Sequence, residues 1–207
     1  MDRLLSIVGF VALNGFWFFA AALVALVLIR DRRKRLSFLR VALVLGGIIV
    51  GSIFIGASLG KLRPLQGFAW GWPSVKLSIS YFAIQVASYQ ILSPEASMVV
   101  ARILPFAELA LGLWLVSGIA RRYSSLVASI VLLGFISAIT YAYLHGLKID
   151  CGCGIGPPEE AGPAALLRDG IRFFLPSVLL AIGSFYVRRS GTSAVVSEAL
   201  PSTAHAD

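Results

Sequence analysis

Long runs of apolar residues dominate the chain, and short clusters of basic residues separate them. The apolar runs cover residues 4–29, 39–59, 96–117, 124–144 and 164–187. Each run is close to the ~20 residues that a helix needs to cross the hydrocarbon core of a bilayer. Because backbone N–H and C=O groups must find partners inside such a segment, the runs predict transmembrane helices. The sequence lacks the alternating strand pattern of a membrane β-barrel.

Residues 65–94 form the one long stretch that fits no simple span. Aromatic residues such as Trp72 and Tyr81 are interrupted there by polar residues such as Lys76 and Gln85. Since Trp and Tyr favour the headgroup zone, we predict an interfacial or re-entrant segment with a helix near 74–91. The competing interpretation is a full extra span, which would invert the orientation of everything downstream.

Basic clusters at 30–35, 121–122 and 188–189 indicate the orientation, because cytoplasmic loops carry an excess of Lys and Arg. A five-span topology with an extracytoplasmic N-terminus places all three clusters in the cytoplasm. We therefore predict a multi-pass protein of the bacterial inner membrane with a cytoplasmic C-terminus. Its expected parts are an N-terminal anchor with a basic loop (1–36), a four-helix membrane domain (37–189) and a disordered tail (190–207).

Composition supports the membrane assignment and excludes one class of partner. Hydrophobic residues make up 58% of the 207 residues and charged residues only 14%, against about 25% charged residues in soluble domains. The net charge of +8 comes from basic residues at the ends of the apolar runs. Because no basic stripe with interleaved aromatic residues is present, we expect a lipid bilayer and no nucleic acid as the partner.

The chain has two cysteines, Cys151 and Cys153, separated by one glycine in the loop before the last apolar run. A disulfide ring of this size departs from relaxed geometry, and strained, exposed disulfides are the labile or catalytic ones. The predicted topology places the pair outside the cytoplasm, where disulfides persist. The charge of Lys148 favours a thiolate there, whereas that of Asp150 opposes it.

Two other interpretations of the cysteine pair stay open. A passive bridge would only hold the loop, although a bridge closing so short a loop contributes little stability. A soft-metal site would use His145 with Cys151 and Cys153 as ligands for copper(I) or zinc, but no fourth ligand is evident and no metal is assigned. With a single pair, the chain cannot relay electrons between its own cysteines, so redox chemistry needs a partner or a cofactor.

Glu108 lies within the apolar run 96–117, where a charged residue is costly and usually faces the interior of a bundle. Its candidate partners are Lys61, Arg102 and Arg168. One interpretation is a structural ion pair, and the other is a proton or quinone site near the outer face. Tyr141, Tyr143 and His145, just before the cysteine loop, are typical of interfacial anchors.

Four motifs, in their order and spacing, resemble the MauE/DoxX-like membrane proteins, particularly the methylamine-utilisation MauE branch. They are Gly60–Pro64, Tyr89–Leu92, Leu104–Gly112 and Asp150–Gly154, and the likeness covers about residues 39–187. The resemblance implies a four-helix DoxX-like bundle core, to which this chain adds an N-terminal transmembrane helix. The chain departs from the family's usual Cys-Gly-Cys-Phe-Gly at Ile155.

The resemblance also implies a function in periplasmic disulfide formation. MauE is associated with maturation of the small, disulfide-rich subunit of methylamine dehydrogenase, alongside a thioredoxin-like protein. We therefore expect an all-α integral membrane protein with Cys151 and Cys153 as the exchanging pair. The expected supporting residues are Lys61, Glu108, His145, Lys148, Asp150 and Arg168. The alternative from another class is a non-enzymatic subunit that scaffolds a respiratory or redox complex.

Overall fold

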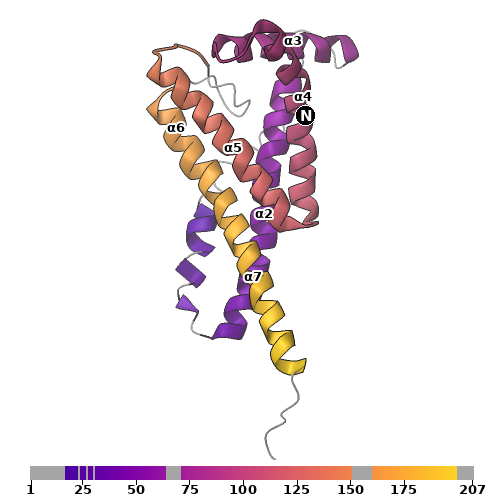
Figure 1. The fold of residues 1–207 in the computed structure, drawn as a ribbon, viewed down its shortest axis with the longest axis vertical. Coiled ribbons are helices and arrows are strands. Elements are labelled where there is room, and N and C mark those ends of the chain that lie inside the picture. Colours follow the sequence, from indigo (N-terminus) through magenta and orange to yellow (C-terminus); the bar gives the residue numbers. More distant parts are fainter. Residues whose placement is uncertain are drawn as a thin grey trace, which may run out of the picture.

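The structure, a computed structural model, describes residues 17–22, 24–26, 28–29, 31–63, 71–150 and 160–199. Within these ranges every regular element is a helix, and the ribbon is elongated (Figure 1). The elements are α2 (Arg32–Leu62), α3 (Trp72–Ser88), α4 (Pro94–Ser117), α5 (Arg121–Leu144), α6 (Pro163–Asp169), the π-helical turn η1 (Gly170–Phe174) and α7 (Leu175–Ala199). The prediction of an all-α membrane protein is confirmed for this part of the chain.

Four helical segments are long and apolar enough to cross a membrane: Lys34–Leu62, Pro94–Ser117, Arg121–Leu144 and Pro163–Val187. They match the last four predicted runs. Of the first run, the described part includes the apolar helix Trp17–Leu26, and the predicted span 4–29 extends beyond the described residues. The extra N-terminal span therefore stays a prediction.

Large apolar side chains face outward from the long helices. Ile103 on α4, Ile130 on α5 and Ile182 on α7 are each exposed over about three fifths of their surface (61%, 61% and 62%). Apolar surface of this extent around a helical bundle requires hydrocarbon in place of water. The helices therefore belong in a lipid bilayer.

The ends of α4 follow from local sequence. The Ser93 hydroxyl accepts a hydrogen bond from the N–H of Ala96 (3.3 Å), and Pro94 occupies the first helical position. At the other end Gly118 takes a left-handed conformation (φ 69°), which ends the helix at little steric cost. The chain then reverses at once into α5.

Helix α3 explains the aromatic stretch 65–94. With 17 residues it is shorter than the ~20 residues of a full span, and Figure 1 shows it lying across one end of the bundle. Ile79, Phe82 and Ala83 pack against Leu62 of α2 and Ala101 of α4. The predicted helix near 74–91 is confirmed, with bounds shifted by about a turn, and its placement across the bundle favours the interfacial interpretation.

The orientation of the long helices alternates. Helices α2 and α5 run toward the end where α3 lies, whereas α4 and α7 run away from it (Figure 1). The basic positions at the start of α2 and of α5 therefore lie away from α3, as the five-span topology requires. Which side of the membrane they face stays a prediction.

Two helix backbones approach each other closely where α2 crosses α4. A Cβ atom built on Gly51 would lie 2.7 Å from the carbonyl oxygen of Gly112, and one on Gly112 would lie 2.8 Å from the carbonyl oxygen of Gly51. Only glycine at both positions permits this approach of two backbones, which is how small residues support helix packing in lipid. The glycine-rich sequence of α2 therefore acts chiefly at this crossing.

A serine contact joins α5 to α7. The hydroxyls of Ser129 and Ser177 lie 3.1 Å apart, and the Ser177 hydroxyl also donates to the carbonyl oxygen of Ser125 (3.4 Å). All three serines are buried. Such short polar side chains hydrogen-bond across helices without the desolvation cost of a charge.

The last span is one continuous helix through α6, η1 and α7, with the π-helical turn at Gly170–Phe174. Helix α7 extends to Ala199, so residues 190–199 are helical where the sequence analysis expected a disordered tail. The physical reason is cooperativity, because adding residues to an existing helix avoids the cost of nucleation. Residues 200–207 lie outside the described part.

The glycine crossing predicts unequal effects of two Gly→Ala substitutions. Gly112→Ala places a methyl group against backbone atoms of Gly51 and Ile55, so α2 and α4 must separate. We expect a loss of about 1–3 kcal/mol in the free energy of unfolding. Gly134→Ala is the control, because a Cβ there meets no atom within 4 Å.

Thermal unfolding of the detergent-solubilised variants, followed by circular dichroism, measures the difference. Equal stability of Gly112→Ala and Gly134→Ala would contradict the close crossing.

Candidate functional site

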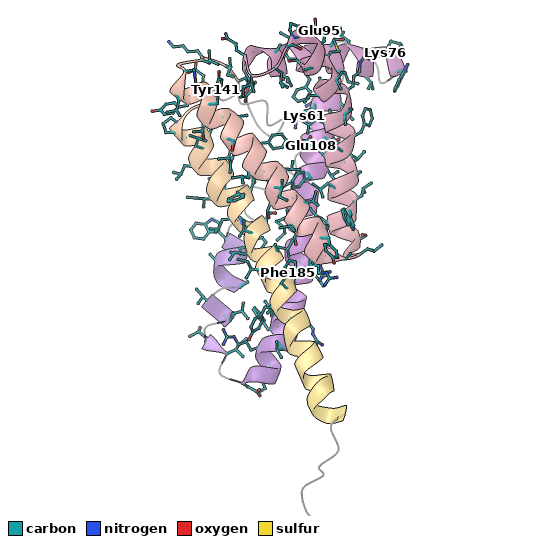
Figure 2. All side chains as sticks on the ribbon, viewed as in Figure 1. Lys61, Lys76, Glu95, Glu108, Tyr141 and Phe185 are labelled. Atoms are coloured by element: carbon teal, nitrogen blue, oxygen red, sulfur yellow. The ribbon has the colours of Figure 1, made fainter. Side chains whose placement is uncertain are left out.

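A buried ion pair joins α2 to α4 below α3. The Lys61 Nζ atom donates to both carboxylate oxygens of Glu108, at 2.8 Å each. The two side chains are 5% and 1% exposed. Figure 2 shows both residues near the end of the bundle that carries α3, on neighbouring helices.

The helix crossing determines which cation reaches Glu108. Lys61 lies in the last turn of α2, where the helix dipole favours a cation. From the Gly51–Gly112 contact, Lys61 lies ten residues toward α3 and Glu108 lies four, which is about 15 Å and about 6 Å of helical rise. The long lysine side chain therefore reaches back along α2 to the carboxylate. Of the other candidate partners, Arg102 is exposed, and the side chain of Arg168 lies outside the described part of the structure.

Aromatic rings surround the ammonium group. The Lys61 Nζ lies 5.6 Å from the ring centroid of Phe82 on α3 and 5.7 Å from that of Phe135 on α5. Both distances are within the ~6 Å range of a cation–π contact. The ammonium is thus held by one carboxylate and two ring faces, contributed by three helices.

A cavity of about 280 Å³ adjoins the ion pair. The cavity lies between several helices, and most of the residues that line it are apolar. They belong to α2, α3, the turn after α3, α4, α5 and η1. The lining consists of Ile53, Phe54, Ala57, Lys61, Phe82, Gln85, Val86, Tyr89, Ile91, Leu92, Val100, Leu104, Glu108, Leu132, Phe135, Ala138, Ile139 and Phe173. Figure 1 shows α5 diverging from α2 and α4 toward this end of the bundle.

The π-helical turn contributes to the cavity wall. Its Phe173 is buried and lines the cavity. A π-helical turn inserts one extra residue into the helical repeat and occurs frequently at functional sites. Here the turn contains the aromatic ring that lines the space between the helices.

The stem of the cysteine loop lies beside this cavity. Asp150 and Glu160 form an antiparallel β-bridge, and the N–H of Ala161 donates to the carbonyl oxygen of Ile149 (2.8 Å). Ile149 and Ala161 pack in one cluster with Ile139 and Tyr89, which both line the cavity. The loop therefore leaves and re-enters the bundle at a single point next to the cavity. Cys151 and Cys153 themselves lie outside the described residues.

The remaining predicted site residues lie apart from the ion pair. The ring of His145 stacks on Tyr141 with a centroid distance of 4.0 Å, and both residues are on the surface near the loop. Lys148 is also exposed, while Asp150 belongs to the loop stem. Across the described residues no group of three His, Cys, Asp or Glu side chains is arranged for a metal ion.

Sequence reasoning identified the charges of the site but missed its aromatic walls. Phe82, Phe135 and Phe173 come from three helices, and no spacing in the sequence connects them. Tyr89 belongs to a motif that the resemblance singled out, yet its position beside both the cavity and the loop stem depends on the fold.

Comparison with known proteins gives a consistent family. The family model described as methylamine utilisation protein MauE matches residues 39–185, which is well over half of the chain. The chain is 31% identical over 107 residues to the methylamine utilization protein MauE of Paracoccus denitrificans. That alignment covers 51% of this chain and 50% of the relative, so the chain matches about half the length of that protein. No solved structure matches at a significant level.

The buried ion pair predicts strong coupling between two substitutions. Glu108→Leu leaves the Lys61 ammonium buried beside apolar rings, and Lys61→Met leaves the carboxylate without its cation. Each single variant should lose about 3–5 kcal/mol of unfolding free energy. The Lys61→Met/Glu108→Leu double variant should recover most of this loss, because no uncompensated charge remains.

A double-mutant cycle from denaturant unfolding in detergent measures the coupling. Lys76→Met, which removes an exposed lysine of α3, is the control and should change little. Additive losses in the double variant would contradict a direct, buried pair.

Proposed function

The chain belongs to the MauE family of methylamine utilisation proteins, and on this premise we propose that it is a membrane protein of thiol–disulfide exchange. In this proposal the Cys151–Cys153 pair acts on the extracytoplasmic side, in the maturation of a disulfide-containing client. The observation that carries the proposal is the loop stem formed by Asp150 and Glu160, which fixes both ends of the segment that contains the two cysteines beside the cavity.

The proposed exchange transfers two electrons. A thiolate of a partner attacks the Cys151–Cys153 disulfide and forms a mixed disulfide with one of the two sulfurs. The second partner thiolate then displaces that sulfur, so the partner gains a disulfide and the membrane protein gains two thiols. Because the chain has one cysteine pair, a thioredoxin-like extracytoplasmic protein or the client itself must be the partner.

The client follows from the family. Methylamine utilisation is stated in the name of the Paracoccus relative, and the resemblance connects the family with the small subunit of methylamine dehydrogenase. We extend both to this chain as part of the proposal. The matched residues 39–185 support a membrane domain at about 37–189. The anchor at 1–36 is part of the proposal.

Trapping tests the exchange. In Cys153→Ser the remaining Cys151 thiol has no neighbour to resolve a mixed disulfide, so covalent adducts with an extracytoplasmic protein should accumulate in cells. Non-reducing gels and mass spectrometry after acid quenching detect them. The Cys151→Ser/Cys153→Ser variant is the control and should show none. A complete lack of adducts for both single variants would refute the exchange.

Orientation is tested with a membrane-impermeant thiol reagent on reduced whole cells. The wild-type pair should be labelled without lysis, because we place it outside the cytoplasm. The control is Ile119→Cys in the Cys151→Ser/Cys153→Ser background, since Ile119 is 69% exposed in the α4–α5 turn at the opposite end. It should be labelled only after permeabilisation. The reverse pattern would overturn the orientation.

A further inference from the structure

The cavity below α3 combines apolar walls with one pair of opposite charges. Lys61 and Glu108 are the charged residues among those that line it. Apolar residues could stabilise the same helix contact, because a buried ion pair is often no more stabilising than apolar residues of the same volume. Ionisable residues inside a membrane are expensive and usually serve a ligand or a proton path. The pair therefore marks the cavity as a binding site.

The size of the cavity limits its ligand. Its volume of about 280 Å³ is just below the range of small-molecule sites, which is roughly 300–1,000 Å³. Such a volume accommodates a single substituted ring, and it is too small for a phospholipid with two acyl chains. Ile91 and Leu92 line the cavity and are 49% and 40% exposed, so a tail attached to the ring can leave toward the lipid there.

The chemistry of the walls favours a neutral ring with a carbonyl group. The carboxylate of Glu108 neutralises Lys61, so an anionic or cationic ligand gains little net attraction. An ammonium group has three N–H donors, and Glu108 accepts from Lys61 through its two oxygens. Among the described residues the third donor has no hydrogen-bond partner, which leaves it for a ligand oxygen. Phe82 and Phe135, close to the same nitrogen, provide faces for a flat ring.

We propose that this cavity binds the ring of a lipid-soluble quinone, with one quinone carbonyl accepting a hydrogen bond from the Lys61 ammonium. The choice of a quinone among neutral carbonyl compounds rests on the proposed function. Oxidation of the two thiols breaks two S–H bonds, forms one S–S bond and releases two electrons and two protons. A quinone takes up the two electrons and the two protons and becomes a quinol with two O–H bonds, so electrons and protons balance.

The probe for binding is decylubiquinone, a ubiquinone analogue with a short tail, titrated into the purified full-length protein in nanodiscs. Saturable binding is expected, measured by calorimetry and by the rise in unfolding temperature. Lys61→Met/Glu108→Leu should bind at least about tenfold more weakly, which corresponds to ~1.4 kcal/mol for the lost charge-assisted hydrogen bond. Lys76→Met, which removes an exposed lysine outside the cavity, is the control and should bind as wild type.

A second variant tests the cavity without altering the charges. Ala138→Phe places a ring in the space that the ligand would fill, so binding should be lost while the unfolding temperature of the free protein is kept. Absence of saturable binding to the wild-type protein would overturn the proposal. So would unchanged affinity in both Lys61→Met/Glu108→Leu and Ala138→Phe, since the ligand would then bind elsewhere.

The two proposals fail separately. Cys151→Ser/Cys153→Ser should bind decylubiquinone as tightly as wild type, because the cavity contains neither cysteine. Loss of mixed disulfides together with retained quinone binding would refute the thiol exchange alone. Mixed disulfides together with no quinone binding would refute the cavity assignment alone and point to another electron acceptor.

Discussion

The backbone contact between Gly51 and Gly112 is the constraint on which the rest of the bundle depends. It brings α2 and α4 closer than any side chain would allow, and it sets the register of two antiparallel helices. Lys61 and Glu108 then meet at 2.8 Å. In hydrocarbon neither charge is tolerable alone, so the crossing and the ion pair stabilise one arrangement of the two helices.

The close crossing of α2 and α4 is accompanied by a cavity between these two helices, α5 and the last span. Because α5 and the last span diverge from α2 and α4 toward α3, the ion pair faces a cavity in place of a packed core. Helix α3 lies across this end and supplies Phe82 to the shell of Lys61. The π-helical turn at Gly170–Phe174 supplies a further ring. An apolar cavity with one ion pair suits a neutral ligand from the lipid phase. In our proposal this ligand is a quinone that accepts the electrons of the cysteine pair.

The cysteine loop depends on the same end of the bundle. Its stem is closed by the Asp150–Glu160 bridge and packs through Ile149 and Ala161 against residues that also line the cavity. A stem of this kind keeps the two ends of the loop together. In our proposal this loop is the place of the thiol exchange.

The sequence by itself determined the number and approximate limits of the four long helices, because an apolar run of ~20 residues has only one stable form in a bilayer. It also indicated that α3 differs from the spans, and it identified Glu108 and the cysteine pair as chemically informative. It left the partner of Glu108 open among Lys61, Arg102 and Arg168, since sequence spacing says nothing about which faces of distant helices meet. Only the tertiary structure selected Lys61, through the glycine crossing, and assembled Phe82, Phe135 and Phe173 from three helices around one cavity. The physical reason is that secondary structure in lipid is dictated locally by backbone hydrogen bonding, whereas a site between helices depends on packing between residues far apart in the chain.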